Sequence, residues 1–131
     1  FPPRRSSDLG LAESDRGSII LILATDLPLS ARQLKRVIRR TSVGMARLGS
    51  YIGHGSGEIC VGFTTARPKA CSDNFLTQTV LREDKMNLPF RAAGECAEEA
   101  ILQSMWNAEA DISLSGKKVP SLREFLKEKR T

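Results

Sequence analysis

An unbroken run of hydrophobic residues extends from Ile19 to Ala24, directly after the pair Gly17-Ser18. The run is rich in isoleucine and far shorter than the roughly 20 residues of a membrane helix. It therefore predicts a strand over 18–25 that is buried on both faces. Gly17 permits a tight turn or a close backbone approach before this strand. Ser18 is then either the first residue of an ordinary strand or a reactive group on a rigid support.

Apolar residues at helical spacing follow this first strand. Pro28 ends the strand region, Ser30 is a candidate N-cap and Gly49 is a candidate C-terminal stop. Between the cap and the stop we expect one helix, whose apolar side is formed by Leu34, Val37, Ile38, Met45 and Leu48. Its other faces are basic, which we interpret as a solvated surface made by Arg32, Lys35, Arg36, Arg39, Arg40 and Arg47.

A glycine-rich loop over 50–57 leads to a second predicted strand over 58–65. The polar segment 66–89 contains two prolines and predicts an irregular surface loop or insertion. These two strands flank the first predicted helix, an order that is typical of layered α and β structure.

Two further helices are predicted near the C-terminus. The first covers 90–110 and carries a stripe of small residues suited to close packing. The second covers 122–129, where Ser121 and Glu124 form a capping-box pattern. The order of elements predicts an α/β (α+β) domain.

The composition narrows the possible functions. The chain has 131 residues and a net charge of +5, enough for one compact domain. The positive charge is concentrated in one predicted helix, and five phenylalanines, one tyrosine and one tryptophan supply few stacking platforms, so we do not expect a nucleic-acid partner. No apolar run is long enough to predict a membrane partner.

Cys60, Cys71, Cys96 and the lone His54 lack the spacing of a metal site, and we expect neither a metal nor a cofactor. Unpaired thiols favour a reducing compartment such as the cytoplasm, with the periplasm left open as an alternative.

The first residues of the chain have an unusual sequence. Residues 1–9, FPPRRSSDL, are close to the translation of a common sequencing adapter, and we expect them to be an artefact of that origin. A disordered basic tail is the alternative. On the first interpretation authentic sequence begins near Gly10, and the part of the protein upstream of it is missing.

A second constellation lies at the start of the second predicted strand. The segment from His54 to Glu58 reads His-Gly-Ser-Gly-Glu. Residues two apart in a strand point the same way, so Ser56 and Glu58 are expected to face one pocket. The segment lacks the outer spacing of a Gly-x-Ser-x-Gly nucleophile elbow. We expect the backbone N–H groups of Gly55 and Gly57 to support an oxyanion, and His54 to be a surface residue.

Several short motifs follow one another along residues 17–122. They are Gly17-Ser18-Ile19-Ile20, Ala24-Thr25-Asp26-x-Pro28, Gln33-Leu34-Lys35-Arg36, Ala46-Arg47-x-Gly49-Ser50, Gly55-Ser56-Gly57-Glu58, Glu99-Ala100-Ile101-Leu102-x-Ser104 with Gly116, and Val119-Pro120-Ser121-Leu122. In this order and at this spacing they resemble the DmpA-type L-aminopeptidase/D-esterase family, which includes the β-peptidyl aminopeptidases.

The resemblance implies an enzyme made as an inactive precursor that cleaves itself between Gly17 and Ser18. Ser18 then becomes the N-terminal nucleophile, and Ser56 and Glu58 complete the catalytic set. The implied fold is an αββα sandwich of N-terminal-nucleophile type. Residues 10–17 would end the large subunit and 18–131 would form the small-subunit region of a single domain.

The implied partners are the missing large subunit of the same precursor and further copies in a homo-oligomer of processed heterodimers. The implied substrate is a small peptide, an amino acid amide or an ester, and no cofactor is implied. We expect this chain to be inactive alone, because the amine of Ser18 is held in a peptide bond and one face of each strand lacks a covering layer.

Two alternatives stay open. An acyltransferase of the same fold, similar to ornithine acetyltransferase, is disfavoured because that family has threonine at the cleaved position, where this chain has Ser18. A non-catalytic domain would make Ser18 an ordinary strand residue.

Overall fold

The computed structural model describes residues 17–55 and 57–129. Residues 1–16 lie outside this part of the chain, and with them the predicted adapter-derived segment and nearly all of the predicted large-subunit end. Ser56 and residues 130–131 also lie outside the described residues.

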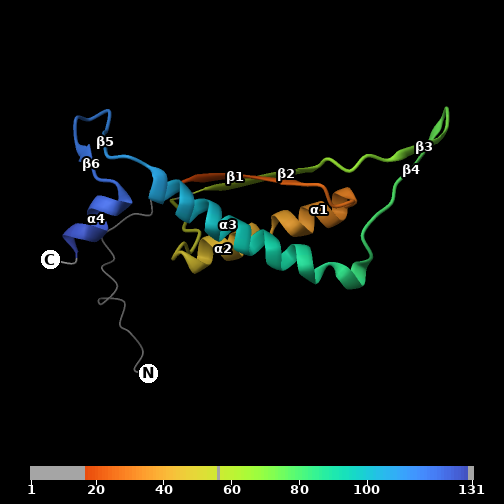
Figure 1. Ribbon diagram of the computed structural model, residues 1–131, viewed down its shortest axis with the longest axis horizontal. Coiled ribbons are helices and arrows are strands. Elements are labelled where there is room, and N and C mark those ends of the chain that lie inside the picture. The colour runs from red at the N-terminus through yellow and green to blue at the C-terminus, as the bar shows by residue number, and fades with distance from the viewer. Residues whose placement is uncertain (1–16, 56, 130–131) are drawn as a thin grey trace, which may run out of the picture.

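Two parallel strands form the centre of the fold. Strand β1 (Ile19–Thr25) pairs with β2 (Glu58–Thr64) without a register shift, from Ile19 opposite Glu58 to Thr25 opposite Thr64. Parallel neighbours need a crossover connection, which here runs through two helices packed beneath the strand pair (Figure 1). Both strands were predicted from the hydrophobic pattern, and both are confirmed within one or two residues.

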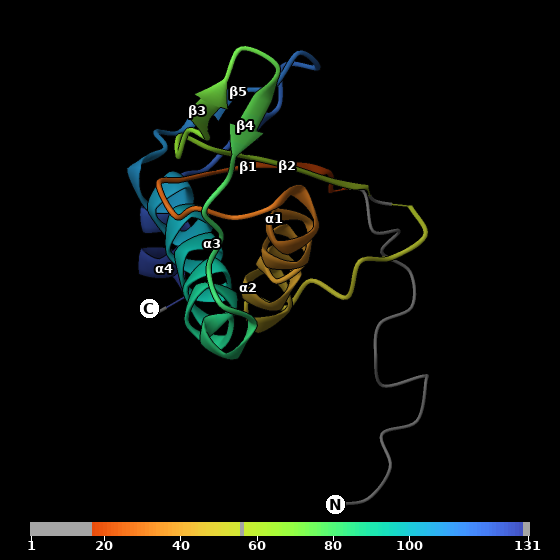
Figure 2. The ribbon, with the colours of Figure 1, turned by 90° about the vertical axis from the view of Figure 1, so that its right-hand side faces the viewer.

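The helices cover one face of the β1–β2 pair (Figure 2). Side chains of β1 alternate between half-buried and exposed, and Ile20 and Ile22 on the open face are 67% and 71% exposed. Within the described residues β1 is therefore not buried on both faces. The sequence of β1 is apolar throughout, as in strands that are buried on both faces. Among the described residues, however, only the face toward the helices is covered.

The predicted first helix is two helices, α1 (Ala31–Ile38) and α2 (Thr41–Arg47). The Thr41 hydroxyl donates a hydrogen bond to the Ile38 carbonyl at 2.7 Å, and the Ser42 hydroxyl donates to the Arg39 carbonyl at 2.7 Å. Side-chain hydroxyl groups that donate to backbone carbonyls compete with the hydrogen bonds of the helix. The backbone therefore breaks between the two helices, although the helical spacing of apolar residues continues across the break.

Both ends of this helical pair match the predicted signals. Ser30 caps α1 in a full capping box with Gln33, with hydrogen bonds of 3.2 and 3.1 Å. After α2 the chain turns at Gly49, whose φ is 96°. The Gly49 N–H donates to the Ala46 carbonyl and the Ser50 N–H donates to the Met45 carbonyl, which is the Schellman arrangement.

Helix α3 (Asn87–Asn107) lies across α2 and below the strands. It begins three residues earlier than predicted, with Pro89 in its first turn, where a missing N–H costs no helical hydrogen bond. The predicted stripe of small residues is confirmed in part: Ala93 and Ala97 are buried, whereas Ala100 and Ala108 are exposed. Gly94, which was not part of the prediction, is buried beside Ala97, and both face α2.

The core is small and sits between α1, α3 and the turn after β1. Leu29, Val37, Met86 and Ala93 form its buried cluster. On the other side of α1, Gly62 of β2 leaves room for Ile38, since a Cβ at position 62 would lie 2.6 Å from the Ile38 Cδ1 atom. Close helix–sheet packing is therefore achieved with few large buried side chains.

The basic surface of α1 is largely exposed, as predicted, and part of it forms an ion-pair cluster. Glu83 of the 3-10 helix η2 (Glu83–Lys85) forms ion pairs with Arg32 and Arg36 and accepts a hydrogen bond from Gln33. The guanidinium groups of Arg36 and Arg40 lie 5.0 and 4.5 Å from the centre of the Phe90 ring. These contacts tie α1 to the segment that leads into α3.

The predicted irregular segment 66–89 contains regular structure. Strands β3 (Lys69–Ser72) and β4 (Phe75–Thr77) form an antiparallel hairpin that projects away from the helices (Figure 1). Both strands are exposed along their whole length. Because neither strand has a buried face, the sequence lacks the alternation of apolar and polar residues that would predict a strand.

The C-terminal region adds a second small hairpin and a final helix. Strands β5 (Asp111–Ile112) and β6 (Lys118–Val119) were not predicted, because the pairing comprises two residues on each side. Helix α4 (Leu122–Glu128) was predicted, and its Ser121–Glu124 capping box is present. No helix in 17–55 and 57–129 is both long and apolar enough to span a membrane.

Candidate functional site

Ser18 stands immediately before β1 and is exposed. Its hydroxyl oxygen accepts a hydrogen bond from the Gly57 N–H, with 3.4 Å between nitrogen and oxygen. The neighbouring Ile19 N–H donates to the Gly57 carbonyl at 3.0 Å. The loop that contains the second predicted constellation therefore closes onto the start of β1, and it does so at the predicted nucleophile.

Glu58 is the first residue of β2 and lies opposite Ile19 in the parallel register. Glu58 directly follows Gly57, whose N–H contacts the Ser18 hydroxyl oxygen. Ser18 and Glu58 line the same groove. Residues that are 40 positions apart in the sequence are thus brought to one site by the pairing of the two strands.

The glycines of the second constellation have different environments. Gly57 is exposed and its N–H is directed at the Ser18 hydroxyl oxygen, which is the attacking atom rather than the carbonyl oxygen on which an oxyanion forms. Gly55 belongs to the exposed turn before it. Ser56, the third member of the predicted catalytic set, lies outside the described residues.

The groove has a volume of about 410 Å³ and runs between the strand starts, the end of α2 and the C-terminal half of α3. Ser18, Ser50 and Glu58 contribute its polar side chains. The rest of its wall is made mostly of apolar side chains, which are Ile19, Met45, Leu48, Tyr51, Ile52, Ile101 and Met105. A mostly apolar concavity with few polar groups is typical of a small-molecule site.

Ile52 has an unusual backbone conformation in this wall. Its φ is 54°, in the left-handed region that β-branched residues rarely adopt. The Ile52 N–H donates to the Ser50 hydroxyl oxygen at 3.3 Å, and Ser50 is itself fixed by the Schellman turn after α2. The end of α2 therefore holds Tyr51 and Ile52 against the groove.

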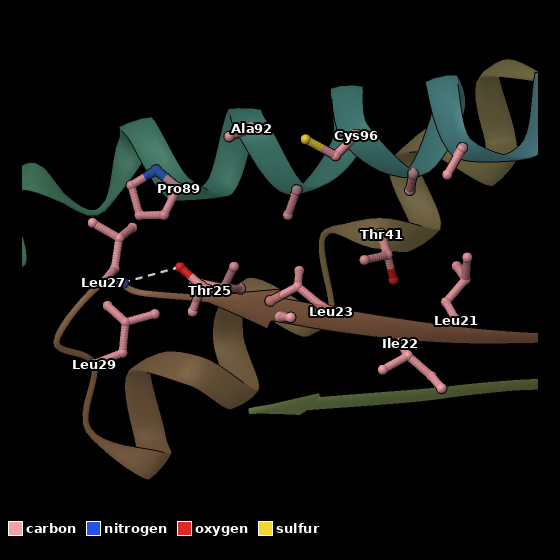
Figure 3. A pocket seen from close by; sticks show the side chains of 15 residues that line it. Leu21, Ile22, Leu23, Thr25, Leu27, Leu29, Thr41, Pro89, Ala92 and Cys96 are labelled. Carbon is pink, nitrogen blue, oxygen red and sulfur yellow. Dashed lines mark hydrogen bonds between the residues drawn. The ribbon is translucent and has the colours of Figure 1, made fainter. Parts of the chain in front are cut away.

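A second cavity of about 300 Å³ lies between β1 and α3 (Figure 3). Leu21 and Leu23 of β1 face Ala92 and Cys96 of α3 across it, and the Leu27 N–H donates to the Thr25 hydroxyl at 3.1 Å at one end. None of the predicted site residues lines this cavity. Its wall is hydrophobic and offers no acid–base pair, so the groove at Ser18 is the candidate site.

The remaining residues that were considered for chemistry lie elsewhere. His54 is exposed in the loop, as predicted. Cys60 is half-buried and its Sγ atom lies 3.3 Å from the Thr41 hydroxyl oxygen, whereas Cys71 and Cys96 are exposed. Among the residues that the structure describes, no three His, Cys, Asp or Glu side chains gather in a geometry that would hold a metal ion.

Sequence reasoning identified Ser18, Glu58 and Gly57 but missed the wall of the groove. Met45 and Met105 were assigned to the apolar sides of helices, without a signal that they meet. Tyr51 and Ile52 lie in a loop, and the positive φ of Ile52 is not visible in the sequence because the usual marker is glycine or asparagine.

Comparison with known proteins identifies relatives of this chain. Residues 4–119 match the family described as Peptidase family S58. The chain is 38% identical over 128 residues to the beta-peptidyl aminopeptidase BapA of Sphingosinicella microcystinivorans, covering 92% of this chain and 32% of that protein. A second BapA, from Sphingosinicella xenopeptidilytica, is 30% identical over 108 residues and is covered over 27% of its length.

Two solved structures are also similar. A protein from Pyrococcus horikoshii OT3 is 38% identical, with a TM-score of 0.75, over 95% of this chain and 36% of that one. The L-aminopeptidase D-Ala-esterase/amidase of Ochrobactrum anthropi is 36% identical, with a TM-score of 0.71, over 86% of this chain and 34% of that one. Its structure is described as a variant of the Ntn hydrolase fold and as a prototype for the serine aminopeptidases.

These comparisons confirm the fold class and the family that the sequence motifs indicated. The described strands and helices are a mixed α and β arrangement that matches an N-terminal-nucleophile hydrolase fold, as the resemblance implied. The chain spans about a third of the length of the curated relatives that it matches. On these matches the chain belongs to Peptidase family S58.

Proposed function

We propose that the complete protein is a self-processing serine aminopeptidase that releases N-terminal amino acids from small peptides, amides or esters. The observation that carries this proposal is the contact between the Ser18 hydroxyl and the Gly57 N–H in a groove that Glu58 also lines. A nucleophile, a backbone donor and a carboxylate are the groups that acyl transfer through an N-terminal nucleophile requires.

Processing comes first in this mechanism. The Ser18 hydroxyl oxygen attacks the carbonyl carbon of Gly17, the bond from that carbon to the Ser18 nitrogen breaks, and an ester replaces the amide. Water then hydrolyses the ester, leaving a carboxylate on Gly17 and a free amine on Ser18. The negative charge of this step develops on the Gly17 carbonyl oxygen, and the backbone N–H groups of Gly55 and Gly57 are the proposed donors to it.

The freed amine of Ser18 is the general base of the catalytic cycle. An α-amine has a pKa of about 7.7–8.0, so a useful fraction is unprotonated near neutral pH. It takes the proton from the hydroxyl of its own residue as the oxygen attacks the substrate carbonyl, and it returns the proton to the departing amine. Water then hydrolyses the acyl-enzyme by the same route.

The other two members of the set support this base. Glu58 stabilises the ammonium form of the Ser18 amine, and its place at the first position of β2 gives it access to the groove that Ser18 lines. Ser56 orients the amine or relays its proton. The roles of Gly55 and Gly57 are those of backbone donors.

The large subunit of the same precursor is the proposed partner of this region. The relatives are about three times as long as the part that this chain matches, and the open face of β1 and β2 exposes Ile20, Ile22 and Phe63. An exposed apolar sheet face calls for a second layer. We propose that the large subunit supplies it, completing an αββα sandwich, and that processed heterodimers assemble into a homo-oligomer.

Intact-mass measurement and N-terminal sequencing of the complete protein test the proposal. We expect a chain that begins Ser-Ile-Ile-Leu, produced by cleavage between Gly17 and Ser18, together with hydrolysis of amino acid p-nitroanilides. Ser18→Ala should stay uncut and inactive. Ser104→Ala, which removes a hydroxyl from α3 outside the groove, should be cut and active. Aminopeptidase activity in a single uncut chain would refute the proposal.

A further inference from the structure

The apolar wall of the groove has no role in the mechanism above. It is formed by the end of α2, the loop after it and the second half of α3, in the groove that Ser18 also lines. We propose that this wall is the subsite for the side chain of the substrate's N-terminal residue, and that Ile52 and Met105 set the size of the side chain that it accepts. The inference rests on the proposed function, because it takes Ser18 as the nucleophile.

The composition of the groove supports this assignment. The reacting carbonyl has to sit at Ser18, and most of the side chains that line the groove with Ser18 are apolar. A substrate side chain that continues from the reacting carbonyl into the groove meets Met45, Ile101 and Met105. Burial of apolar surface there is favourable in proportion to the area removed from water, whereas a charged side chain would be desolvated without a partner.

The size of the groove agrees with this use. Its volume of about 410 Å³ falls within the range of roughly 300–1,000 Å³ found for small-molecule sites. Met45 and Met105 are unbranched thioethers that adapt to different shapes. The wall therefore suits bulky aliphatic and aromatic side chains better than small ones.

Ile52 supplies an independent argument. A β-branched residue at φ 54° is strained, and glycine at this position would be free of that strain. Strained residues that persist beside candidate catalytic groups point to a functional use of the side chain. Ile52 lines the groove, so its side chain is available to a ligand.

The test measures the ratio of kcat/KM for the p-nitroanilide of phenylalanine to that of alanine, using the complete processed protein. Met105→Phe fills the groove from α3 and is expected to lower the ratio on the order of 10-fold, the lower end of what a misfit in an apolar pocket causes. Met105→Ala lengthens the groove and is expected to move the ratio in the opposite direction. Leu102→Ala is the matched control, because Leu102 lies on the same helix with similar exposure but does not line the groove.

Ile52→Gly separates a specificity role from a structural one. The change removes both the side chain and the strain, so we expect an unchanged or higher Tm together with a changed ratio of the two substrates. A structural role would instead lower Tm and leave the ratio as it is. Self-cleavage between Gly17 and Ser18 reports that each variant has folded.

The outcomes distinguish the inference from the function on which it rests. An enzyme that turns over alanine p-nitroanilide with the same substrate ratio in Met105→Phe, Ile52→Gly and the wild type overturns the inference alone; another part of the protein then covers the wall. A wild-type protein that hydrolyses neither substrate overturns the proposed function, and the inference with it.

Discussion

The crossing of α2 and α3 offers a sharp test of the packing. At Gly44 an added Cβ would lie 2.4 Å from the Gly94 carbonyl oxygen, 2.6 Å from the Glu98 nitrogen and 2.9 Å from the Ala97 Cβ. Two of these atoms belong to the backbone of α3, so no side-chain rotation relieves the contact. Gly44→Ala is therefore expected to push the two helices apart.

The magnitude follows from these distances. Ordinary contact begins near 3.4 Å, so relieving the 2.4 Å contact needs a separation of about 1 Å, and contacts along the crossing weaken with it. Overpacking of this kind costs about 1–3 kcal/mol, sometimes more. The better helix propensity of alanine offsets about 1 kcal/mol at most. We expect a net loss of about 1–2 kcal/mol, together with reduced activity because Met45 next to Gly44 lines the groove.

Gly94→Ala is the matched control on the facing helix. Its added Cβ would meet the Arg40 carbonyl oxygen at 3.5 Å and Val43 at 3.6 Å, which are ordinary contacts. This variant should be unchanged or more stable by about 0.5–1 kcal/mol through helix propensity. Urea unfolding of the complete protein measures both. Equal urea midpoints for the two variants, or a higher midpoint for Gly44→Ala than for Gly94→Ala, would refute the close approach of α2 and α3.

Three further predictions concern the site and the ion-pair cluster. Glu58→Gln keeps the shape and removes the charge, so kcat should fall on the order of 10²–10⁴-fold with a smaller change in KM, and unchanged turnover in a processed variant would leave Glu58 as a strand-end residue. The hydrogen bond from Arg36 lowers the pKa of Glu83 below its usual value of 4.5, against a smaller opposing effect of burial and with help from Gln33 and Arg32. The stabilisation from Glu83 is therefore fully present above pH 4.5 and is lost as the pH falls through the lowered pKa. The Tm difference between wild type and Glu83→Gln should accordingly be present at neutral pH and vanish in acid; a constant difference would contradict this. Residues 10–131 expressed alone should not hydrolyse amino acid p-nitroanilides. Activity should require both the large subunit and cleavage before Ser18. Turnover by the uncleaved piece would count against the free-amine mechanism.

Local sequence signals determined the elements with strong patterns. The apolar run after Ser18 specified β1, the apolar segment after Glu58 specified β2, and the N-cap at Ser30 and the capping box at Ser121 marked the starts of α1 and α4. These signals succeed because hydrophobic periodicity and N-cap hydrogen bonds act over a few residues. The family motifs likewise identified Ser18 and Glu58 as candidates without any knowledge of their positions in space.

The tertiary structure decided how those elements end and which other elements they contact. The break between α1 and α2 depends on hydroxyl groups of Thr41 and Ser42 that take backbone carbonyls, and a continuous apolar pattern does not show it. The exposed β3–β4 hairpin has no buried face to leave a period in the sequence.

The site shows the same division. Ser18 meets Gly57 only because β1 and β2 pair in parallel, and the groove exists only where the end of α2 turns toward the strands beside α3. Contacts between residues far apart in the chain depend on packing that no local pattern encodes. The candidate residues of the site were therefore readable from residue types, whereas the shape of the groove arose from the way the helices pack beneath the strands.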